Sequence, residues 1–236
     1  MIDILYIYKH STNDDQELKY SLRSLEKYVN DYKRIFITGD IPDFIDEKKV
    51  IYTPEKDIGA PMTNHWWKVI QTIRNTHDKN TYEFALMYDD IFFVKPTNLS
   101  NYPYYQRGDL GEDKNGGEHY QQTLLNAKQF LEEHGQTTYD FELHTPFVYD
   151  SYSFAKINHL FESRKDDCQS MAVRSVYGNT FHSDAPYRGD IKIRGLEKVE
   201  DVIGVADCFS VSESAFQYDT KRFLEKEFPN KSRWEK

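Results

Sequence analysis

Short apolar runs alternate with amphipathic stretches in the first part of this chain, and the alternation restricts the folds open to it. One helical stretch carries a leucine stripe at Leu18, Leu22 and Leu25, and a second covers 64–77. The strand-like runs that surround these helices stand at 2–8, 34–40, 49–54 and 84–88. The order β-α-β-β-α-β is typical of a mostly parallel sheet covered by helices. The sequence therefore predicts an α/β domain.

The rest of the chain predicts further elements of both kinds. Helices are expected at 120–134, 154–161, 170–181 and 219–227. Strands are expected at 91–94, 139–150 (ending near His144), 190–194 and 201–206. The segment 107–119 is charged, glycine-rich and without periodicity, which predicts a mobile loop. No internal repeat or long linker divides the sequence, so we expect one catalytic domain over 1–236.

Composition narrows the function classes. Acidic residues outnumber basic ones by 39 to 30, and a net charge of −9 argues against a broad basic face for nucleic acid. Two cysteines, Cys168 and Cys208, are too few for a disulfide framework. No apolar stretch approaches the length that crosses a bilayer. We expect a cytoplasmic protein, and its 18 tyrosines suit surfaces that hold planar or polyhydroxylated ligands.

Two adjacent aspartates, Asp89 and Asp90, separate the apolar run 84–88 from the next run at 91–94. In sheets of this kind, ligands bind beyond the carboxyl ends of the strands. Two carboxylates there can hold Mg²⁺ or Mn²⁺, and the ion in turn holds the diphosphate of a nucleotide-linked donor. A capped turn with a salt bridge explains the same two residues without a ligand, and a bare pair leaves both interpretations open.

Several stretches, in order, resemble one family. They are "ELKYSLRSLEKY" followed by "RIFITGDIPDF", then "LMYDDIFFVKP", "HTPFVYD", "AVRSVYGNTF" and "FLEKEFPNKSRWEK". Together they resemble the Stealth family of sugar-phosphate transferases, whose core is a variant of the glycosyltransferase-A fold. The chain departs from that family in two places: it lacks the Trp-x-Asp-Gly stretch after the first strand, and it has Tyr88 where asparagine is usual. Compact chains of this pattern also look like phage-type and bacterial glycosyltransferases.

The resemblance implies a donor side built on the aspartate pair. Asp89 and Asp90 would bind the divalent metal and the donor diphosphate, with Asp90 also a catalytic residue. Tyr20 and Arg23, three residues apart on the first helix, would contact the donor, and Arg23 would reach a phosphate. A solvated helix face is the alternative for Arg23.

The resemblance also implies roles for four residues elsewhere in the chain. Asn64 and His65 would contact the donor, although Asn64 also suits a simple helix cap. His144 would be the general base for the acceptor hydroxyl, because imidazole accepts a proton near neutral pH. Arg174 would stabilise phosphate charge as the donor bond breaks. A satisfied buried histidine and a surface helix arginine are the respective alternatives.

Three functions follow as hypotheses. The first is a metal-dependent transferase that moves a glycosyl group from a nucleoside-diphosphate sugar, UDP-linked in our expectation, to an acceptor hydroxyl. The second is Stealth-like transfer of hexose 1-phosphate to a glycan. The third is a non-catalytic module that binds sugar or nucleotide. The acceptor would be a glycan, a small molecule or a modified nucleobase, and no obligate protein partner is implied.

Overall fold

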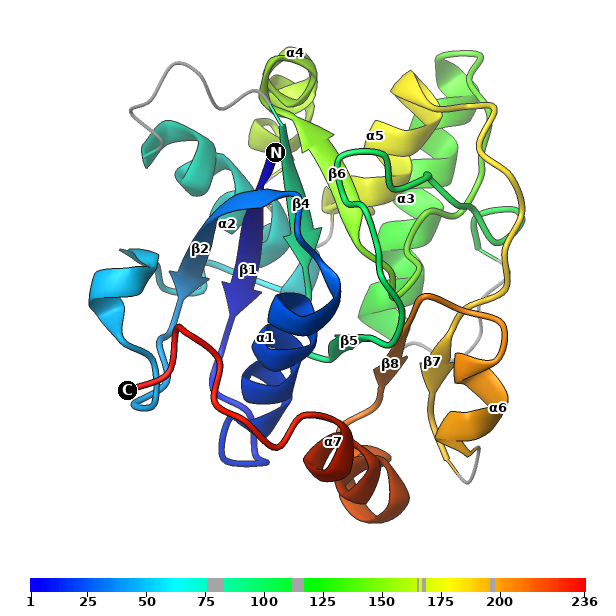
Figure 1. Cartoon of the computed structure of the whole chain (residues 1–236). Coiled ribbons are helices and arrows are strands. Elements are labelled where there is room, and N and C mark those ends of the chain that lie inside the picture. The colour runs from blue at the N-terminus through cyan, green and yellow to red at the C-terminus, as the bar shows by residue number, and fades with distance from the viewer. Residues whose placement is uncertain (76–82, 112–116, 165, 167–168, 196–197) are drawn as a thin grey trace.

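A five-stranded sheet forms the centre of the molecule (Figure 1). The computed structural model describes residues 1–75, 83–111, 117–164, 166, 169–195 and 198–236. The strand order is β3-β2-β1-β4-β6, and all neighbours are parallel except β4 and β6. The strands are β1 (Ile2–Tyr8), β2 (Tyr32–Gly39), β3 (Ile51–Pro54), β4 (Glu83–Met87) and β6 (Phe147–Asp150). The predicted α/β class, with a mostly parallel sheet flanked by helices, is confirmed.

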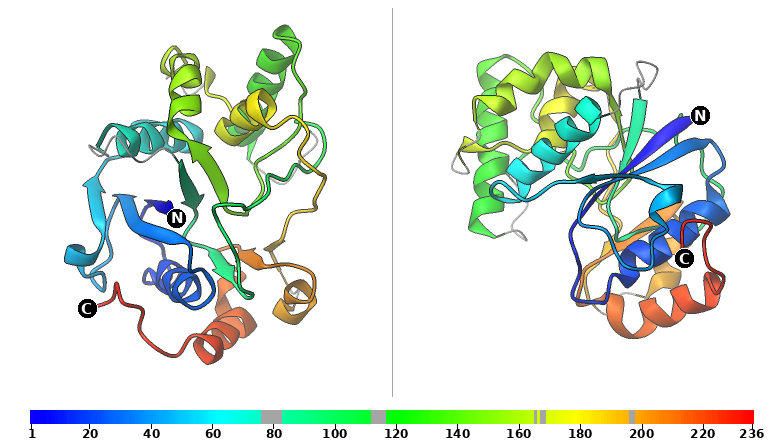
Figure 2. Two further views of the ribbon diagram at one scale, coloured as in Figure 1. Left: turned by 45° about the horizontal axis from the view of Figure 1, so that its top comes forward. Right: turned by 90° about the vertical axis from the view of Figure 1, so that its left-hand side faces the viewer.

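Both faces of the sheet are buried, which explains why its strands are apolar runs and not alternating ones. Alternate residues of β1 separate into two cores: Leu5 packs with Phe36 on one face, and Ile4 packs with Ile37 on the other. The helix α1 (Gln16–Tyr28) brings its leucine stripe to the second face. The helix α2 (Pro61–Asn75) covers the first face, on the opposite side of the sheet (Figures 1 and 2).

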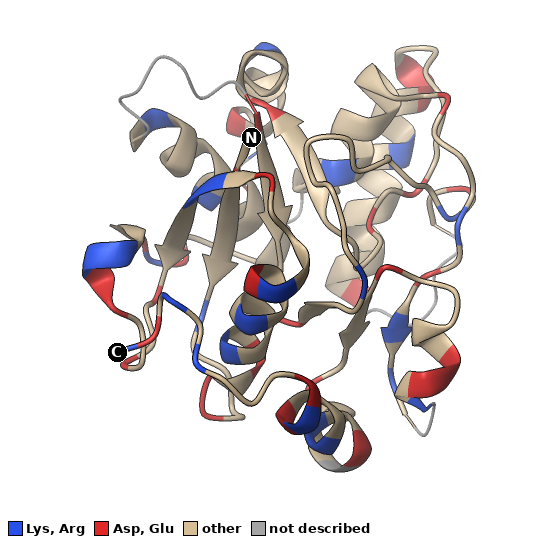
Figure 3. Cartoon of the chain, in the orientation of Figure 1, with Lys and Arg blue, Asp and Glu red and all other residues tan. Residues whose placement is uncertain are grey.

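The remaining helices complete this arrangement. They are α3 (Glu118–Glu133), α4 (Ser151–Glu162), α5 (Val173–Phe181), α6 (Val199–Ile203) and α7 (Lys221–Glu227), with shorter turns at η1 (Glu47–Lys49) and η3 (Phe216–Thr220). Helix α2 begins three residues earlier than expected because Pro61 suits a first helical position. Residues 76–77 of that prediction lie outside the described residues. Charges of both signs lie on α1 and α7 (Figure 3).

Two strand predictions are wrong. The stretch 139–150 is not one strand: pairing begins only at Phe147, after Pro146, whose missing N–H cannot join a ladder. Residues 201–206 contain the end of helix α6 instead of a strand, because Val199 and Val202 at helical spacing pack on a third core. The strand of this region is Cys208–Val211, β8, and all of its residues are buried.

A second sheet, in the order β5-β8-β7, lies beyond the carboxyl end of β4 (Figure 1). Its strands are β5 (Ile91–Phe93), β7 (Lys192–Ile193) and β8. The chain leaves the central sheet after Met87 and enters the second sheet at Ile91. Asp89 and Asp90 therefore form the junction between two sheets, and this is why apolar runs flank them on both sides.

Part of the predicted mobile loop at 107–119 is packed. The Arg107 backbone N–H donates to the Asp140 carbonyl at 2.9 Å, and the Leu110 N–H donates to the Thr138 carbonyl at 2.8 Å. Residues 112–116 lie outside the described residues, and α3 begins at Glu118.

Two further observations concern the cysteines and the membrane. Cys208 is a buried free thiol, whereas Cys168 is outside the described part of the chain. Within the residues that the structure describes, no helix combines the length and apolar character that crossing a membrane requires.

Candidate functional site

The aspartate pair lies in a tight turn at the end of β4, closed by a hydrogen bond from the Ile91 N–H to the Tyr88 carbonyl at 3.3 Å. One carboxylate oxygen of Asp90, Oδ2, accepts from Lys192 Nζ at 2.9 Å and from Ser210 Oγ at 2.8 Å. The other oxygen, Oδ1, is buried and has no hydrogen-bond partner among the described residues. A buried acceptor without a donor is costly, so this atom is poised for a ligand.

Asp89 lies in an acidic and poorly solvated environment. Burial raises its pKa to about 8, and the negative charges of Asp90 and Glu17 act in the same direction. The positive charge of Lys192 opposes this rise in the pKa of Asp89. Asp89 therefore keeps its proton near neutral pH in the protein alone, and a cation bound beside it would displace that proton.

His144 lies at the same edge, although it precedes a strand instead of ending one. Because β6 runs antiparallel to β4, with Phe147 opposite Leu86, residues before β6 lie beside the residues that follow β4. The imidazole Nδ1 is 3.0 Å from Asp190 Oδ2, and the His144 backbone N–H donates to Asp190 Oδ1 at 3.2 Å. An ionised Asp190 makes Nδ1 the protonated nitrogen and leaves Nε2 as a proton acceptor.

Asp190 is a functional candidate that the sequence did not indicate. It accepts from Arg194 at 2.6 Å in addition to His144, and Arg107 lies 3.8 Å away. Burial alone would raise the pKa of Asp190, but the hydrogen bonds from His144 and Arg194 hold it well below its usual range. Asp190 is thus a fixed negative charge behind the imidazole. The alternation of polar and apolar residues in "DIKIR" (190–194) was the available signal.

The segment that carries Asp190 also joins His144 to the aspartate pair. Asp190 and Lys192 are two residues apart on an extended chain and point to one face, while Ile191 and Ile193 are buried. Asp190 contacts His144 and Lys192 contacts Asp90. Two residues of extended chain span roughly 7 Å, so the segment that runs from Asp190 into β7 holds His144 and Asp90 a short distance apart.

Arg174 is fully buried in α5, so the alternative of a surface helix arginine is wrong. Its guanidinium donates to the Leu143 carbonyl and to the Thr145 carbonyl, the second at 3.1 Å. It also lies over the Tyr88 ring, 4.5 Å from the centroid. These contacts hold both neighbours of His144, so Arg174 is placed to position the histidine, while its buried Nε has no hydrogen-bond partner among the described residues. The predicted contact of Arg174 with a ligand phosphate stays a prediction.

His65 and Asn64 are held by the protein itself. His65 is buried, with Tyr88 Oη 3.3 Å from Nδ1 and Tyr149 Oη 3.4 Å from Nε2. Burial, helped by the charge of Arg174, lowers its pKa to about 3, so the ring is neutral. The Asn64 side chain accepts from the Ile58 N–H at 2.8 Å and fastens the loop before α2. The polar side-chain atoms of His65 and Asn64 already have partners within the protein, so the structure gives no support to their predicted donor contacts.

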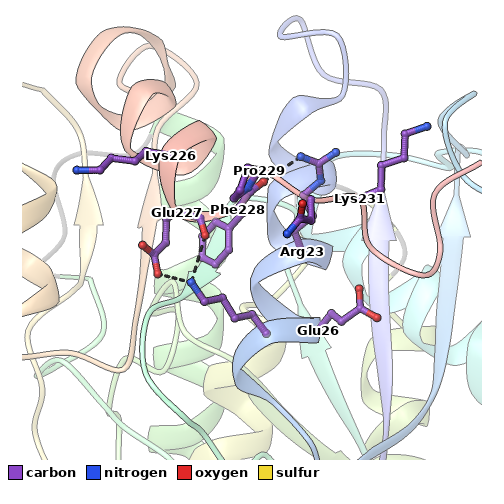
Figure 4. A pocket seen from close by; sticks show the side chains of 9 residues that line it. Arg23, Glu26, Lys226, Glu227, Phe228, Pro229 and Lys231 are labelled. Atoms are coloured by element: carbon purple, nitrogen blue, oxygen red, sulfur yellow. Dashed lines mark hydrogen bonds and ion pairs between the residues drawn. The ribbon is translucent and has the colours of Figure 1, made fainter.

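Arg23, on the first helix, faces the C-terminal segment (Figure 4). Arg23 makes two hydrogen bonds to the Glu235 carboxylate, both 2.7 Å long, and donates to the Phe228 carbonyl at 2.9 Å. Tyr20 is buried in the third core with Phe228. The predicted donor contact of Arg23 is replaced by a contact within the chain. Its partner lies 212 residues away, a pairing for which the sequence contains no signal.

The chain matches no protein-family model and no curated protein. Across the described residues, no group of three or more His, Cys, Asp or Glu side chains is arranged to hold a metal ion. Asp89 and Asp90 alone would supply two carboxylates. Mg²⁺ is commonly bound in proteins by one or two carboxylates together with substrate phosphates and water. The pair, with its unpaired Asp90 Oδ1, therefore has the ligand types of a cation site shared with a phosphate-bearing ligand.

Proposed function

We propose that this protein is a metal-dependent nucleotide-sugar transferase with a glycosyltransferase-A-like fold, which moves a glycosyl group from a UDP-linked donor to an acceptor hydroxyl. The observation that carries the proposal is one edge of the sheet that holds both kinds of group the reaction needs. On one side is the acidic pair with the buried, unpaired Asp90 Oδ1. On the other side is an imidazole oriented by a carboxylate, His144 with Asp190.

The acceptor oxygen forms a bond to the anomeric carbon of the donor sugar as the bond from that carbon to the diphosphate oxygen breaks. The acceptor proton passes to His144 Nε2, and the electron pair of the broken bond leaves with the diphosphate. Asp190 stabilises the imidazolium that forms, because its carboxylate accepts from Nδ1. Arg174 keeps the backbone on both sides of His144 in place.

Asp89 and Asp90 would hold Mn²⁺ or Mg²⁺, which stabilises the charge that develops on the departing diphosphate. In the protein alone, Lys192 Nζ lies 2.9 Å from Asp90 Oδ2 and supplies the positive charge at this position. Lys192 would either remain as a second cation or move aside when the ion binds. Both arrangements keep the site from carrying uncompensated negative charge.

Donor binding tests the proposal directly. We expect UDP-sugars to raise the melting temperature in the presence of Mn²⁺, because a ligand that binds only the folded state stabilises it. Asp90→Asn should abolish this stabilisation, since it removes the charge that the ion needs. Asp219→Asn is the matched control, because that carboxylate is 78% exposed on a surface turn. Equal stabilisation of wild type and Asp90→Asn would refute the metal assignment.

The base is tested separately. His144→Ala should lower transfer by roughly 10²–10⁴-fold and leave donor affinity unchanged, as for loss of a general base. Asp190→Asn should lower kcat with little effect on the donor KM, and Asp190→Glu should recover part of the loss. An equal loss of donor affinity in His144→Ala would assign the histidine to the donor instead.

Transfer of hexose 1-phosphate uses the same metal and base, and the products separate the two reactions. Glycosyl transfer releases a nucleoside diphosphate, whereas sugar-phosphate transfer releases the monophosphate. We expect the diphosphate. Analysis of the released nucleotide by chromatography decides between them.

One observation favours a non-catalytic binding module as the second candidate. Lys192 already pairs with Asp90 Oδ2, so one of the four carboxylate oxygens of the pair is engaged by a protein cation. Lys192→Gln distinguishes the two functions. If the protein is an enzyme that needs the metal, Lys192→Gln should bind Mn²⁺ more tightly than wild type. If it is a metal-free binding module, wild type should bind its nucleotide in the absence of Mn²⁺.

A further inference from the structure

A cavity of about 520 Å³ lies between β7 and the short helix α6. Its volume is within the range of small-molecule sites. Arg188, Asp190 and Lys192 line one side, and Asp201, Val202 and Val205 line the other. In Figure 3 the basic strand β7 and the acidic helix α6 stand next to each other. Because Asp190 and Lys192 also contact His144 and Asp90, a single strand joins the cavity to the candidate site.

Arg188 is the cation of this cavity whose side chain has no ion pair within the described part of the protein, since the other cation, Lys192, pairs with Asp90. It is partly buried, and its guanidinium carbon lies 4.6 Å from the centroid of the Tyr105 ring. An arginine stacked on an aromatic face keeps its N–H groups at the edge of the guanidinium plane, where they match a carboxylate or phosphate in a bidentate manner.

The acidic residues of the cavity do not neutralise Arg188. Asp190 is occupied by His144 and Arg194, with Arg107 also near. Asp201 lies on α6 and is exposed. A partly buried guanidinium without a carboxylate partner is unfavourable, and an anionic ligand would relieve the cost.

We propose that this cavity binds an anionic group, a carboxylate or a phosphate, on the molecule that receives the sugar. Arg188 grips the anion, and Val202 and Val205 contact the apolar part of the same molecule. The anion site stands on the cavity and on Arg188. Its assignment to the acceptor rests on the proposed function. If the protein is the proposed transferase, a hydroxyl of the molecule bound in the cavity has to reach His144 across β7.

The anion site is tested without donor or metal, by calorimetric titration with four probes. Glucose 6-phosphate and inorganic phosphate carry the phosphate, glucuronic acid carries the carboxylate, and glucose is the neutral comparison. We expect at least one charged sugar to bind at millimolar concentration and glucose not to bind. The better of the two charged sugars identifies the anion, and weak binding of inorganic phosphate would show that the sugar ring also contributes.

Two variants locate the binding. Arg188→Gln should weaken the charged sugar by roughly tenfold or more, the loss expected when a charge-assisted hydrogen bond is removed. Val205→Trp should also block the site while leaving Arg188 in place, since Val205 is 84% exposed at the cavity wall and tolerates a larger side chain. Arg222→Gln, whose side chain is 82% exposed on α7, is the control. Thermal melts show whether each variant folds.

The results separate the site from the proposed function. Equal affinity in wild type and Arg188→Gln would overturn the anion site, as would displacement of the sugar by UDP with Mn²⁺. Binding of no charged sugar would also overturn it. If the charged sugar binds through Arg188 but no UDP-sugar stabilises the protein, the acceptor assignment is overturned. Binding of both, without mutual displacement, supports it.

Discussion

Replacement of Asp89 by asparagine should change how the stability of this protein depends on pH. The Asp89 pKa is raised from 3.8 to about 8 by burial and by neighbouring carboxylates. Between these two pH values the folded protein therefore holds one proton that the unfolded chain has lost. The free energy of unfolding falls as pH rises through this interval, because the folded state must lose that proton in an unfavourable place.

The magnitude follows from the slope of proton linkage. One proton contributes about 1.4 kcal/mol per pH unit, so a rise from about pH 6.5 to about pH 8 should remove about 2 kcal/mol in wild type. Most of the opposite contribution of His65 falls below this interval, because its pKa is 6.5 in the unfolded chain and about 3 in the fold. Asp89→Asn should lack this loss and should be the more stable protein at the alkaline end.

Urea unfolding at several pH values, followed by tryptophan fluorescence, measures the effect. Asp219→Asn serves as the comparison, because its carboxylate is mostly exposed on a surface turn. The reasoning is refuted if wild type and Asp89→Asn lose stability in parallel over this interval. Saturating Mn²⁺ provides a second measurement: an ion at the pair should displace the proton and flatten the wild-type slope.

Three further predictions concern stability away from the aspartate pair. Gly39→Ala should lower the free energy of unfolding by at least about 2 kcal/mol, because φ of Gly39 is +124° and an added Cβ would lie 2.0 Å from the Tyr8 carbonyl oxygen. Gly189→Ala is the control: an added Cβ there meets no atom within 4 Å, so the same urea titration should show a far smaller loss. Glu235→Gln should cost roughly 3 kcal/mol by breaking a buried ion pair and should leave UDP-sugar affinity intact, whereas a loss of that affinity would restore a donor role to Arg23. Wild type should lose stability as pH falls below 6.5, because His65 is protonated in the unfolded chain but stays neutral in the buried site. His65→Gln should lack this loss. Identical acid titrations of the two proteins would contradict the prediction.

The elements that the sequence predicted well are those with a local cause. The strands of the central sheet are buried on both faces, so each appears as an apolar run, and the stripe of α1 has helical periodicity. The strand predicted over 139–150 began too early, because the aromatic and polar residues before β6 continue into the strand without a break in the sequence pattern. The ladder itself starts only at Phe147, where the backbone meets β4.

The sequence predicted only those parts of the candidate site in which residues adjacent in the chain lie together. Asp89 and Asp90 follow a strand, and that placement was visible in the sequence. The residues that orient the site come from far along the chain: Asp190 is 46 residues from His144, and Lys192 is 102 residues from Asp90. Antiparallel addition of β6 and parallel addition of β7 bring them together. No local pattern encodes such pairings, and the same holds for Arg23 with Glu235.

The short strand β7 has a consequence for regulation of the site. Asp190 and Lys192 are two residues apart on one extended segment, so the restraint on the imidazole and the charge beside Asp90 come from neighbouring positions of the chain. If a bound cation displaced Lys192 from Asp90, the movement would act on the extended segment that also carries Asp190, two residues before Lys192. Thermodynamic reciprocity then requires that a molecule engaging His144 alter cation affinity by the same factor. Loading of the donor side and readiness of the acceptor side would be coupled through the short segment from Asp190 to Lys192.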